Sequence, residues 1–479
     1  MARSRFTSGA KNPPMNTFIK NLFLLAACVA GFGLATAAAG AQTFRTLHSF
    51  DGGDANAPWA GLVLSSNTLY GTGSSGGSLN HGAVFALNSD GAGFTNLHSF
   101  DGDRASPRAG VIVSGNTLYG TTLYGGSSDW GAVFAVNTDG TGFTNLHSFT
   151  APSDGTNSDG VLPTGELILS GNTLYGTAQQ AGSRGRGAIF RINTDGTGFT
   201  NLYDFTQEGD GAGSYAGLIL SSNTLFGTTR TGGSFGGGTV FKVNTDGTGF
   251  TNVYAFSQGN DGAAPVSGVI LSGNTLYGTA YYGGSSGNGT VFAVNTDGTG
   301  FTLLHTFTAL SGGASTNNDG AAPNAGLILS GNTLLGTVLG GGHWGYGTVF
   351  AVNTDGTGFT TLHHFTGGSD GGNPAGDLSL SGTTLYGTTL NGGSPGYGTV
   401  FSLSLLPQLA IVRSGATIVL TWPTHFAGFD YTGFALQSTT NLVSPVVWST
   451  NSLPPVVVNG QNTVTNPASG PKKFYRLNQ

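Results

Sequence analysis

The hexapeptide Asn116-Thr117-Leu118-Tyr119-Gly120-Thr121 is one of seven copies of a phrase that runs through most of the chain. Two copies carry Phe226 or Leu335 in place of Tyr. The copies begin at Asn67, Asn116, Asn172, Asn223, Asn274, Asn332 and Thr383, which places them 49 to 58 residues apart. A period near fifty residues is typical of one propeller blade. The hexapeptide therefore predicts a tandem repeat in which each copy belongs to one small sheet.

Four short strands are expected around each copy. In the second repeat they are residues 110–114, 116–122, 131–137 and 142–149, each rich in Val, Leu, Phe, Tyr or Thr and bounded by Gly, Asn, Asp or Ser. The segments are apolar at both odd and even positions, as in Val133-Phe134-Ala135-Val136. Such a strand is covered on both faces, which favours a sheet placed between two others.

The ends of the repeat are out of phase. A strand of the fourth type, residues 43–50, precedes the first complete set, whereas the last strand of the third type, residues 398–401, has no fourth strand after it. The N-terminal strand is therefore expected to complete the last sheet, which would remove two open sheet edges. The predicted fold is all-β, a seven-bladed β-propeller over residues 42–405 that is closed by its N-terminal strand.

Residues 406–479 have a different composition and begin at an expected linker, Leu406-Pro407. Strands are expected at residues 410–412, 418–422, 434–438, 446–449, 456–458 and 474–477. Their spacing favours a small Ig-like or fibronectin-like β-sandwich as a C-terminal module.

Residues 1–41 have the features of a secretory signal peptide. They carry four cations and no acid, then an apolar run over residues 22–39 and the small-x-small sequence Ala39-Gly40-Ala41. Translation from Met15 would preserve the same features. A lipoprotein cleavage before Cys28 is an alternative, although it would leave an apolar stretch at the mature N-terminus. Either way the chain is expected to be exported to the periplasm, the cell surface or the medium.

Charge and cysteine content exclude several classes of function. Of 16 Lys and Arg, four lie in the leader, so the mature chain carries 12 against 22 Asp and Glu, a net charge of about −10. An acidic chain without a basic track is not expected to bind nucleic acid. Cys28 is the only cysteine, so no disulfide or cysteine metal site is expected after cleavage. We expect no metal, no cofactor, no membrane span after the leader, and a monomer.

Four separate segments of the repeat carry a family resemblance. Asn-Thr-Leu-Tyr-Gly-Thr, Gly-Gly-Ser, Gly-Thr-Val-Phe and Leu-His-Ser-Phe together resemble the GloVer (Gloeo-Verruco) tandem repeats of exported bacterial proteins, over residues 43–403. Residues 434–442 and 474–477 are similar to C-terminal modules of such proteins. The resemblance implies export and residence at the surface or outside the cell. It implies no established reaction and no catalytic residues.

Several apparent motifs are products of the repeat. Three Gly-x-Ser-x-Gly matches, at Gly232, Gly283 and Gly392, lie in equivalent β-loops, whereas a nucleophile elbow is a single strand-to-helix turn. One strand position holds an aromatic hydrogen-bonding residue in every repeat, namely His48, His98, His147, Tyr203, Tyr254, His305 and His363. We expect these side chains between neighbouring sheets. The Asp of each long loop, such as Asp54 and Asp210, is expected to form a turn. A ring of these carboxylates that binds a cation is the less favoured alternative.

Two carboxyls break the repeat. Glu166 and Asp377 replace the Gly that opens the first strand in most repeats, and they fall in the third and seventh repeats. Paired carboxylates across a cleft could perform acid–base or glycosidase chemistry. Two solvated charges at strand starts would explain the same pattern.

Aromatic residues break the repeat in the long loops. The candidate ligand-binding residues are Trp59, Tyr124, Trp130, Tyr282, Trp344 and Tyr346. Aromatic rings on a polar loop surface can stack on sugar rings or on side chains of a partner. Each ring could equally cover its own loop as a local core.

These patterns favour an extracellular or cell-surface binding propeller without catalytic activity. A polysaccharide or a surface protein is the expected partner. A carbohydrate-active enzyme, hydrolase or lyase, that uses Glu166 and Asp377 is the alternative, and a purely structural surface protein is a third possibility.

Overall fold

The computed structural model describes residues 42–101, 105–313, 315–440, 442, 446–451, 454–468 and 473–478. The predicted signal peptide, residues 1–41, lies outside the described residues. The described chain divides into two compact units. The repeat unit comprises residues 42–406 with Ala427–Phe429, and the C-terminal unit comprises 407–426 with 430–478.

The repeat unit consists of four-stranded antiparallel sheets, numbered here from 1 to 7. Sheet 1 contains β2 (Val63–Ser65), β3 (Thr68–Gly73), β4 (Ala83–Asn88) and β5 (Thr95–Ser99), and sheet 2 contains β6 (Ile112–Ser114), β7 (Thr117–Thr122), β8 (Ala132–Asn137) and β9 (Thr144–Ser148). Sheet 3 contains β10 (Ile168–Ser170), β11 (Thr173–Ala178), β12 (Ala188–Asn193) and β13 (Thr200–Asp204), and sheet 4 contains β14 (Ile219–Ser221), β15 (Thr224–Thr229), β16 (Thr239–Asn244) and β17 (Thr251–Ala255). Sheet 5 contains β18 (Ile270–Ser272), β19 (Thr275–Ala280), β20 (Thr290–Asn295) and β21 (Thr302–Thr306), and sheet 6 contains β22 (Ile328–Ser330), β23 (Thr333–Val338), β24 (Thr348–Asn353) and β25 (Thr360–His364). Sheet 7 contains β26 (Ser379–Ser381), β27 (Thr384–Thr389), β28 (Thr399–Ser404) and β1 (Thr43–Ser49).

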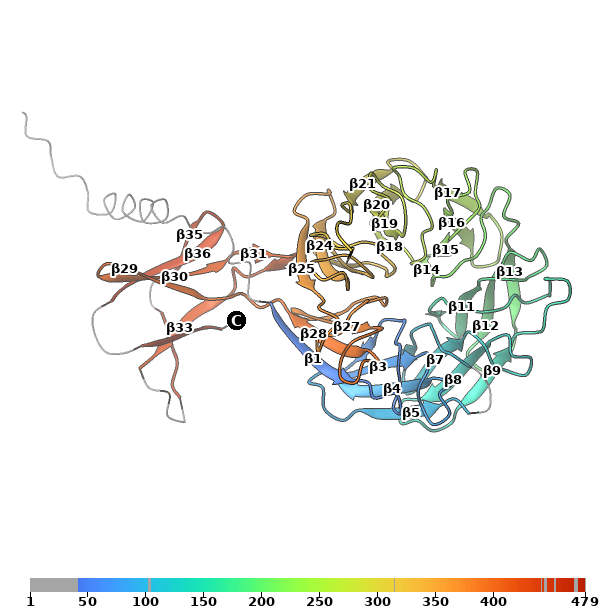
Figure 1. The fold of residues 1–479 in the computed structure, drawn as a ribbon, viewed down its shortest axis with the longest axis horizontal. Coiled ribbons are helices and arrows are strands. Elements are labelled where there is room, and N and C mark those ends of the chain that lie inside the picture. Colours follow the sequence, from blue (N-terminus) through green and yellow to red (C-terminus); the bar gives the residue numbers. More distant parts are fainter. Residues whose placement is uncertain are drawn as a thin grey trace, which may run out of the picture. The chain divides into compact units, whose positions relative to one another are not determined.

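Successive sheets lie side by side around a common centre (Figure 1). Strand β1, from the start of the repeat unit, pairs antiparallel with β28 from its end, with Thr43 opposite Ser404 and Ser49 opposite Thr399. In the part of the repeat unit that the structure describes, every regular element is a strand. The prediction of an all-β fold built from repeated four-stranded sheets is confirmed.

The hexapeptide forms the second strand of each sheet, and its Gly is required by packing inside the sheet. A Cβ on Gly227 would lie 2.6 Å from Cζ of Phe241 on the neighbouring strand and 2.7 Å from Leu218. The same Phe position covers the hexapeptide Gly in every other sheet. The preceding Leu, such as Leu225, is fully buried. The hexapeptide Gly thus leaves room for the large Phe ring of the third strand to pack against the backbone of the second strand.

The last Thr of the hexapeptide connects neighbouring sheets. Its Oγ1 donates a hydrogen bond of 2.8–3.4 Å to a carbonyl in the segment that opens the next sheet: Thr72 to Ala109, Thr177 to Ala216, Thr228 to Ser267, Thr279 to Ala325, Thr337 to Gly376 and Thr388 to Ala60. The last of these bonds runs from sheet 7 to sheet 1. In sheet 2 the equivalent hydroxyl of Thr121 is buried and has no hydrogen-bond partner among the described residues.

The repeated His or Tyr also lies between sheets, as predicted. Each ring stacks on a Phe of the next sheet at 3.6–4.1 Å between centroids: His48 on Phe94, His98 on Phe143, His147 on Phe199, Tyr203 on Phe250, Tyr254 on Phe301, His305 on Phe359 and His363 on Phe44. The far end of the ring binds the loop Asp that the sequence assigned to a turn. These contacts, 2.6–3.2 Å long, are His48–Asp54, His147–Asp159, Tyr203–Asp210, Tyr254–Asp261, His305–Asp319 and His363–Asp370.

The C-terminal unit contains two sheets. One has the order β29-β30-β36-β35 and the other β34-β33-β37, while β31 and β32 form a hairpin at the boundary of the two units. The strands are β29 (Ala410–Ser414), β30 (Thr417–Pro423), β31 (His425–Phe426), β32 (Phe429–Asp430), β33 (Ala435–Thr439), β34 (Ser449–Thr450), β35 (Val456–Val458), β36 (Gln461–Pro467) and β37 (Phe474–Asn478). Leu420, Trp422, Tyr431 and Val464 are buried. The fibronectin-like assignment stays a prediction.

The bond between sheets 7 and 1 can be measured by substitution. Thr388→Val removes the hydroxyl that donates to the carbonyl of Ala60 (2.9 Å) and leaves a half-buried acceptor without that donor. We expect a loss of about 1–2 kcal/mol of unfolding free energy. Thr121→Val is the matched control, because it replaces a buried hydroxyl that has no partner, and it should be neutral or stabilising. Urea unfolding midpoints of the two variants check this, and equal losses would contradict the assigned role of Thr388.

Candidate functional site

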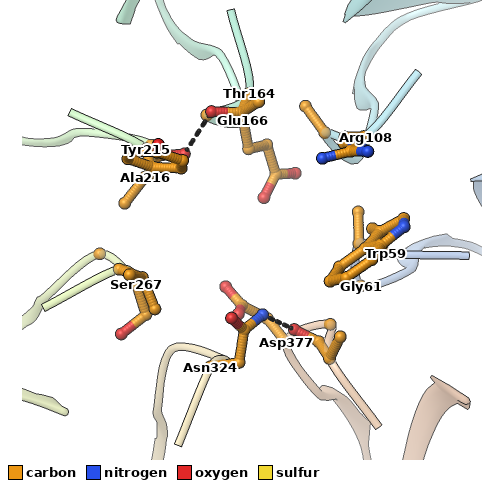
Figure 2. A pocket seen from close by; sticks show the side chains of 18 of the residues that line it. Trp59, Gly61, Arg108, Thr164, Glu166, Tyr215, Ala216, Ser267, Asn324 and Asp377 are labelled. Atoms are coloured by element: carbon orange, nitrogen blue, oxygen red, sulfur yellow. Dashed lines mark hydrogen bonds between the residues drawn. The ribbon is translucent and has the colours of Figure 1, made fainter. Parts of the chain in front are cut away.

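A pocket of about 400 Å³ is lined by residues from all seven sheets of the repeat unit. Each sheet contributes residues that lead into its first strand, and these segments encircle the pocket (Figure 2). The segments are 59–61, 108–110, 164–166, 215–217, 266–268, Asn324 and 375–377. The loop after the second strand adds Arg230, Tyr281, Tyr282 and Leu339.

The lining segments touch one another through their backbones. A Cβ on Gly165 would lie 2.4 Å from the carbonyl oxygen of Ala216, and a Cβ on Gly376 would lie 2.2 Å from the carbonyl carbon of Ala60. Side chains add further ties, since Thr164 Oγ1 donates to Tyr215 O at 3.0 Å and Asn324 Nδ2 donates to Ala375 O at 3.1 Å. Short contacts therefore join sheets 3 and 4, sheets 6 and 7, and sheets 7 and 1 in the pocket wall.

One position of the repeat varies in every sheet, and it faces this pocket. Its seven residues are Trp59, Arg108, Thr164, Tyr215, Val266, Asn324 and Ala375. Two positions later, five sheets have Gly, whereas sheets 3 and 7 have Glu166 and Asp377. The repeated residues build the scaffold, and the varied ones determine the chemistry of its centre.

Glu166 and Asp377 project into the pocket (Figure 2). Both side chains are exposed, and the surface that they expose lines the pocket. A Cβ on Gly110 would lie 3.4 Å from Oε1 of Glu166, which places that carboxyl over sheet 2. Asp377 accepts a hydrogen bond of 2.6 Å from the amide of Gly326 in sheet 6.

The surroundings shift the titration of both carboxyls. Desolvation inside the pocket, and after it the charge of Asp377, raise the pKa of Glu166 from 4.5 to about 8. Desolvation also raises the pKa of Asp377, while the hydrogen bond from Gly326 lowers it. Glu166 therefore keeps its proton near neutral pH.

Two arginines lie against aromatic rings of the pocket. The Arg108 guanidinium carbon lies 5.3 Å from the centre of the Trp59 ring, and that of Arg230 lies 5.3 Å from the Tyr215 ring. Arg230 also donates to the Tyr215 hydroxyl at 3.2 Å. Such cation–π contacts hold both partners in place. Tyr281 and Tyr282 meet edge to face, with 4.6 Å between ring centroids.

Four of the residues proposed from the sequence line this pocket, namely Trp59, Tyr282, Glu166 and Asp377. The other candidates lie elsewhere on the loops. Trp130 is half-buried against the core between sheets 2 and 3, and Tyr346 lies over Gly367 and Gly372. Tyr124 and Trp344 are 39% and 59% exposed. Sequence reasoning missed Arg108 and Asn324, although the variation of their repeat position was a usable signal.

Two general features of the described residues bear on the site. No helix in the part of the chain covered by the structure is long and apolar enough to cross a membrane. Within the same residues, no three His, Cys, Asp or Glu side chains are grouped so that they could hold a metal ion.

A model of the Gloeobacter/Verrucomicrobia repeat matches the chain in four overlapping stretches, residues 32–162, 101–256, 207–318 and 313–417. The chain belongs to this repeat family. The resemblance inferred from the hexapeptide and its neighbouring segments is thereby confirmed. The pocket described above is formed within the part of the chain that matches the Gloeobacter/Verrucomicrobia repeat. No curated protein sequence matches the chain significantly.

Several solved structures are similar to this repeat-family chain in fold. An oligogalacturonate lyase in complex with manganese has a TM-score of 0.46 and 12% identity, over 77% of this chain and 99% of that chain. The nidogen/laminin complex has a TM-score of 0.36 and 17% identity, over 53% and 80%. TolB from Acinetobacter baumannii has a TM-score of 0.35 and 13% identity, over 57% and 58%. These likenesses concern the fold and bring no activity to this chain.

The raised pKa of Glu166 predicts a pH-dependent stability difference. The folded protein keeps a proton on Glu166 that the unfolded chain releases above pH 4.5, so stability falls as the pH rises from there to about 8. Glu166→Gln removes this loss. The melting temperature of the variant should therefore rise relative to that of the unsubstituted protein between about pH 5 and about pH 8. Glu208→Gln alters the one other glutamate of the sequence, which is exposed. The difference in melting temperature between this variant and the unsubstituted protein should be the same from about pH 5 to about pH 8. A constant difference for both variants would contradict the prediction.

Proposed function

We propose that the repeat unit is a closed seven-bladed β-propeller that binds a polysaccharide in its central pocket and catalyses no reaction. Three contacts support closure. The β1–β28 pairing completes sheet 7 with the N-terminal strand, and the hydrogen bond from Thr388 to Ala60 and the stack of His48 on Phe94 join sheet 7 to sheet 1. The last two repeat contacts found between other neighbouring sheets, and together the three support a ring of seven equivalent blades.

The observation that carries the binding proposal is the placement of the varied repeat position. A pocket of about 400 Å³ can enclose one or two sugar rings. Its wall offers the rings of Trp59 and Tyr282 for stacking, and Asn324 and Glu166 for hydrogen bonds to hydroxyls. Residues that only filled space would have no reason to differ in every sheet while the surrounding scaffold stays constant.

The remaining parts of the chain fit an exported protein. The predicted signal peptide over residues 1–41 would deliver the propeller to the periplasm, the cell surface or the medium. The C-terminal unit would then serve as a spacer or an attachment module. A surface protein whose side chain enters the pocket would be a second class of partner.

Affinity electrophoresis against a panel of soluble polysaccharides tests the proposal. We expect one polysaccharide to retard the protein and Trp59→Ala to reduce its affinity at least about tenfold, since the ring lines the pocket. Trp344→Ala changes an exposed aromatic residue outside the pocket and serves as the matched control. Loss of binding by Trp344→Ala alone would move the site to the loop surface, and no retardation by any polysaccharide would refute the proposal.

A carbohydrate-active enzyme is the second candidate, favoured by one observation. Glu166, with its pKa raised to about 8, can donate a proton near neutral pH. Two carboxyls in one pocket are the usual acid and base of glycoside cleavage, and Asp377 would take the second role.

This second candidate predicts a pH profile with a defined sign. A general acid must be protonated. The rate of cleavage should therefore not be reduced by this group below about pH 8 and should fall about tenfold for each pH unit above it. Glu166→Gln should abolish the release of new reducing ends from the bound polysaccharide. Binding without any release of reducing ends by the unsubstituted protein would exclude this candidate.

A further inference from the structure

The two carboxyls of the pocket are the only acidic side chains among its lining residues, and they replace glycine at two of seven equivalent positions. In the other five sheets the position holds Gly61, Gly110, Gly217, Gly268 and Gly326. Both carboxyls project toward the open centre of the pocket (Figure 2). A polar ligand at the centre would therefore meet carboxyl oxygens rather than backbone alone.

Neither carboxyl has an ion-pair partner among the described residues. Asp377 has the amide of Gly326, which satisfies one lone pair of one oxygen. The charge of Asp377 raises the pKa of Glu166, so a cation bound between the two carboxyls would offset that effect and favour the ionised form of Glu166.

The cations of the pocket wall are used in other contacts. Arg108 lies over the Trp59 ring, and Arg230 lies over the Tyr215 ring and binds its hydroxyl. In these positions the guanidinium groups support the aromatic wall of the pocket. Among the described residues, neither guanidinium group forms a salt bridge with Glu166 or Asp377.

We infer that the pocket binds an amino sugar whose ammonium group pairs with Glu166 and Asp377 and whose ring lies against the aromatic wall. This inference rests on the proposed function and names the class of its ligand. A pocket of about 400 Å³ is much larger than a bare ion and suits a sugar ring. Only two carboxyls line it, which is fewer than a metal ion of the calcium type takes from protein.

Calorimetric titration of the full chain with three tetrasaccharides tests the inference. The probes are a glucosamine tetramer, an N-acetylglucosamine tetramer and a uronic acid tetramer, at about pH 6, where the amine is charged. We expect the glucosamine tetramer to bind at least about tenfold more tightly than the other two. Binding should release a proton from Glu166, which two buffers of different ionisation enthalpy will reveal.

Substitutions separate the carboxyls from the rest of the pocket. Glu166→Gln and Asp377→Asn, which keep the size of each side chain, should each lower the affinity for the glucosamine tetramer about tenfold or more. Glu166→Gln should also abolish the proton release. Glu208→Gln is the matched control and should change neither quantity, and circular dichroism will verify that each variant is folded.

The outcomes distinguish this inference from the proposed function. Equal or tighter binding of the N-acetylated or the uronic acid tetramer, sensitive to Trp59→Ala, would overturn the inference and leave the polysaccharide pocket standing. Unchanged affinity in both carboxyl variants would overturn it in the same way. Failure of every probe and every polysaccharide to bind would refute the proposed function itself.

Discussion

The hydrogen bond from the last Thr of the hexapeptide to the next sheet is the interaction on which the centre of the repeat unit depends. Thr72 Oγ1 bonds to the carbonyl of Ala109, which lies between the pocket residues Arg108 and Gly110. Thr388 does the same for Ala60, beside Trp59. The acceptor is a backbone carbonyl, so the bond forms whatever side chain the neighbouring residue carries. This is why the pocket position can vary in every sheet without disturbing the scaffold.

The boundary of sheets 2 and 3 departs from this rule, and it is where Glu166 lies. There the hydroxyl of Thr121 has no partner among the described residues. The segment that carries Glu166 is held from its other side, since Thr164 donates to the carbonyl of Tyr215. An ionisable side chain thus occurs at the one boundary where the repeated bond is missing, and the wall is secured by a different contact.

The sequence predicted the contacts of residues that recur in every repeat, but it did not predict contacts made by variable loops or by residues that occur only once. The position of His147 between two sheets follows from its recurrence, but its bond to Asp159 does not, because the intervening loop varies from repeat to repeat. Strand β36 was missed, since its Asn and Pro residues are depleted in strands, yet it pairs with β30 along its whole length. Arg108 and Asn324 were missed because each occurs once and only the ring of segments brings them together.

The aromatic loop residues show why the candidate site could be predicted only in part. The loop after the second strand contributes its first residues to the pocket, such as Arg230 and Tyr282, whereas Trp344 and Tyr346 come later in the equivalent loop and lie outside it. The place of an aromatic residue along this loop therefore decides whether it lines the pocket, and the sequence prediction treated all aromatic loop residues alike.

The protonation state of Glu166 links the alternatives for function. An acid catalyst must carry its proton, whereas a carboxyl that pairs with an ammonium group must lose it. One side chain with a pKa raised to about 8 cannot serve both purposes with the same ligand at the same pH. An amino sugar would lower that pKa by its own charge and so remove the proton on which cleavage depends. In this pocket, tight binding of a cationic sugar and acid catalysis on it are therefore opposed by the same electrostatic interaction.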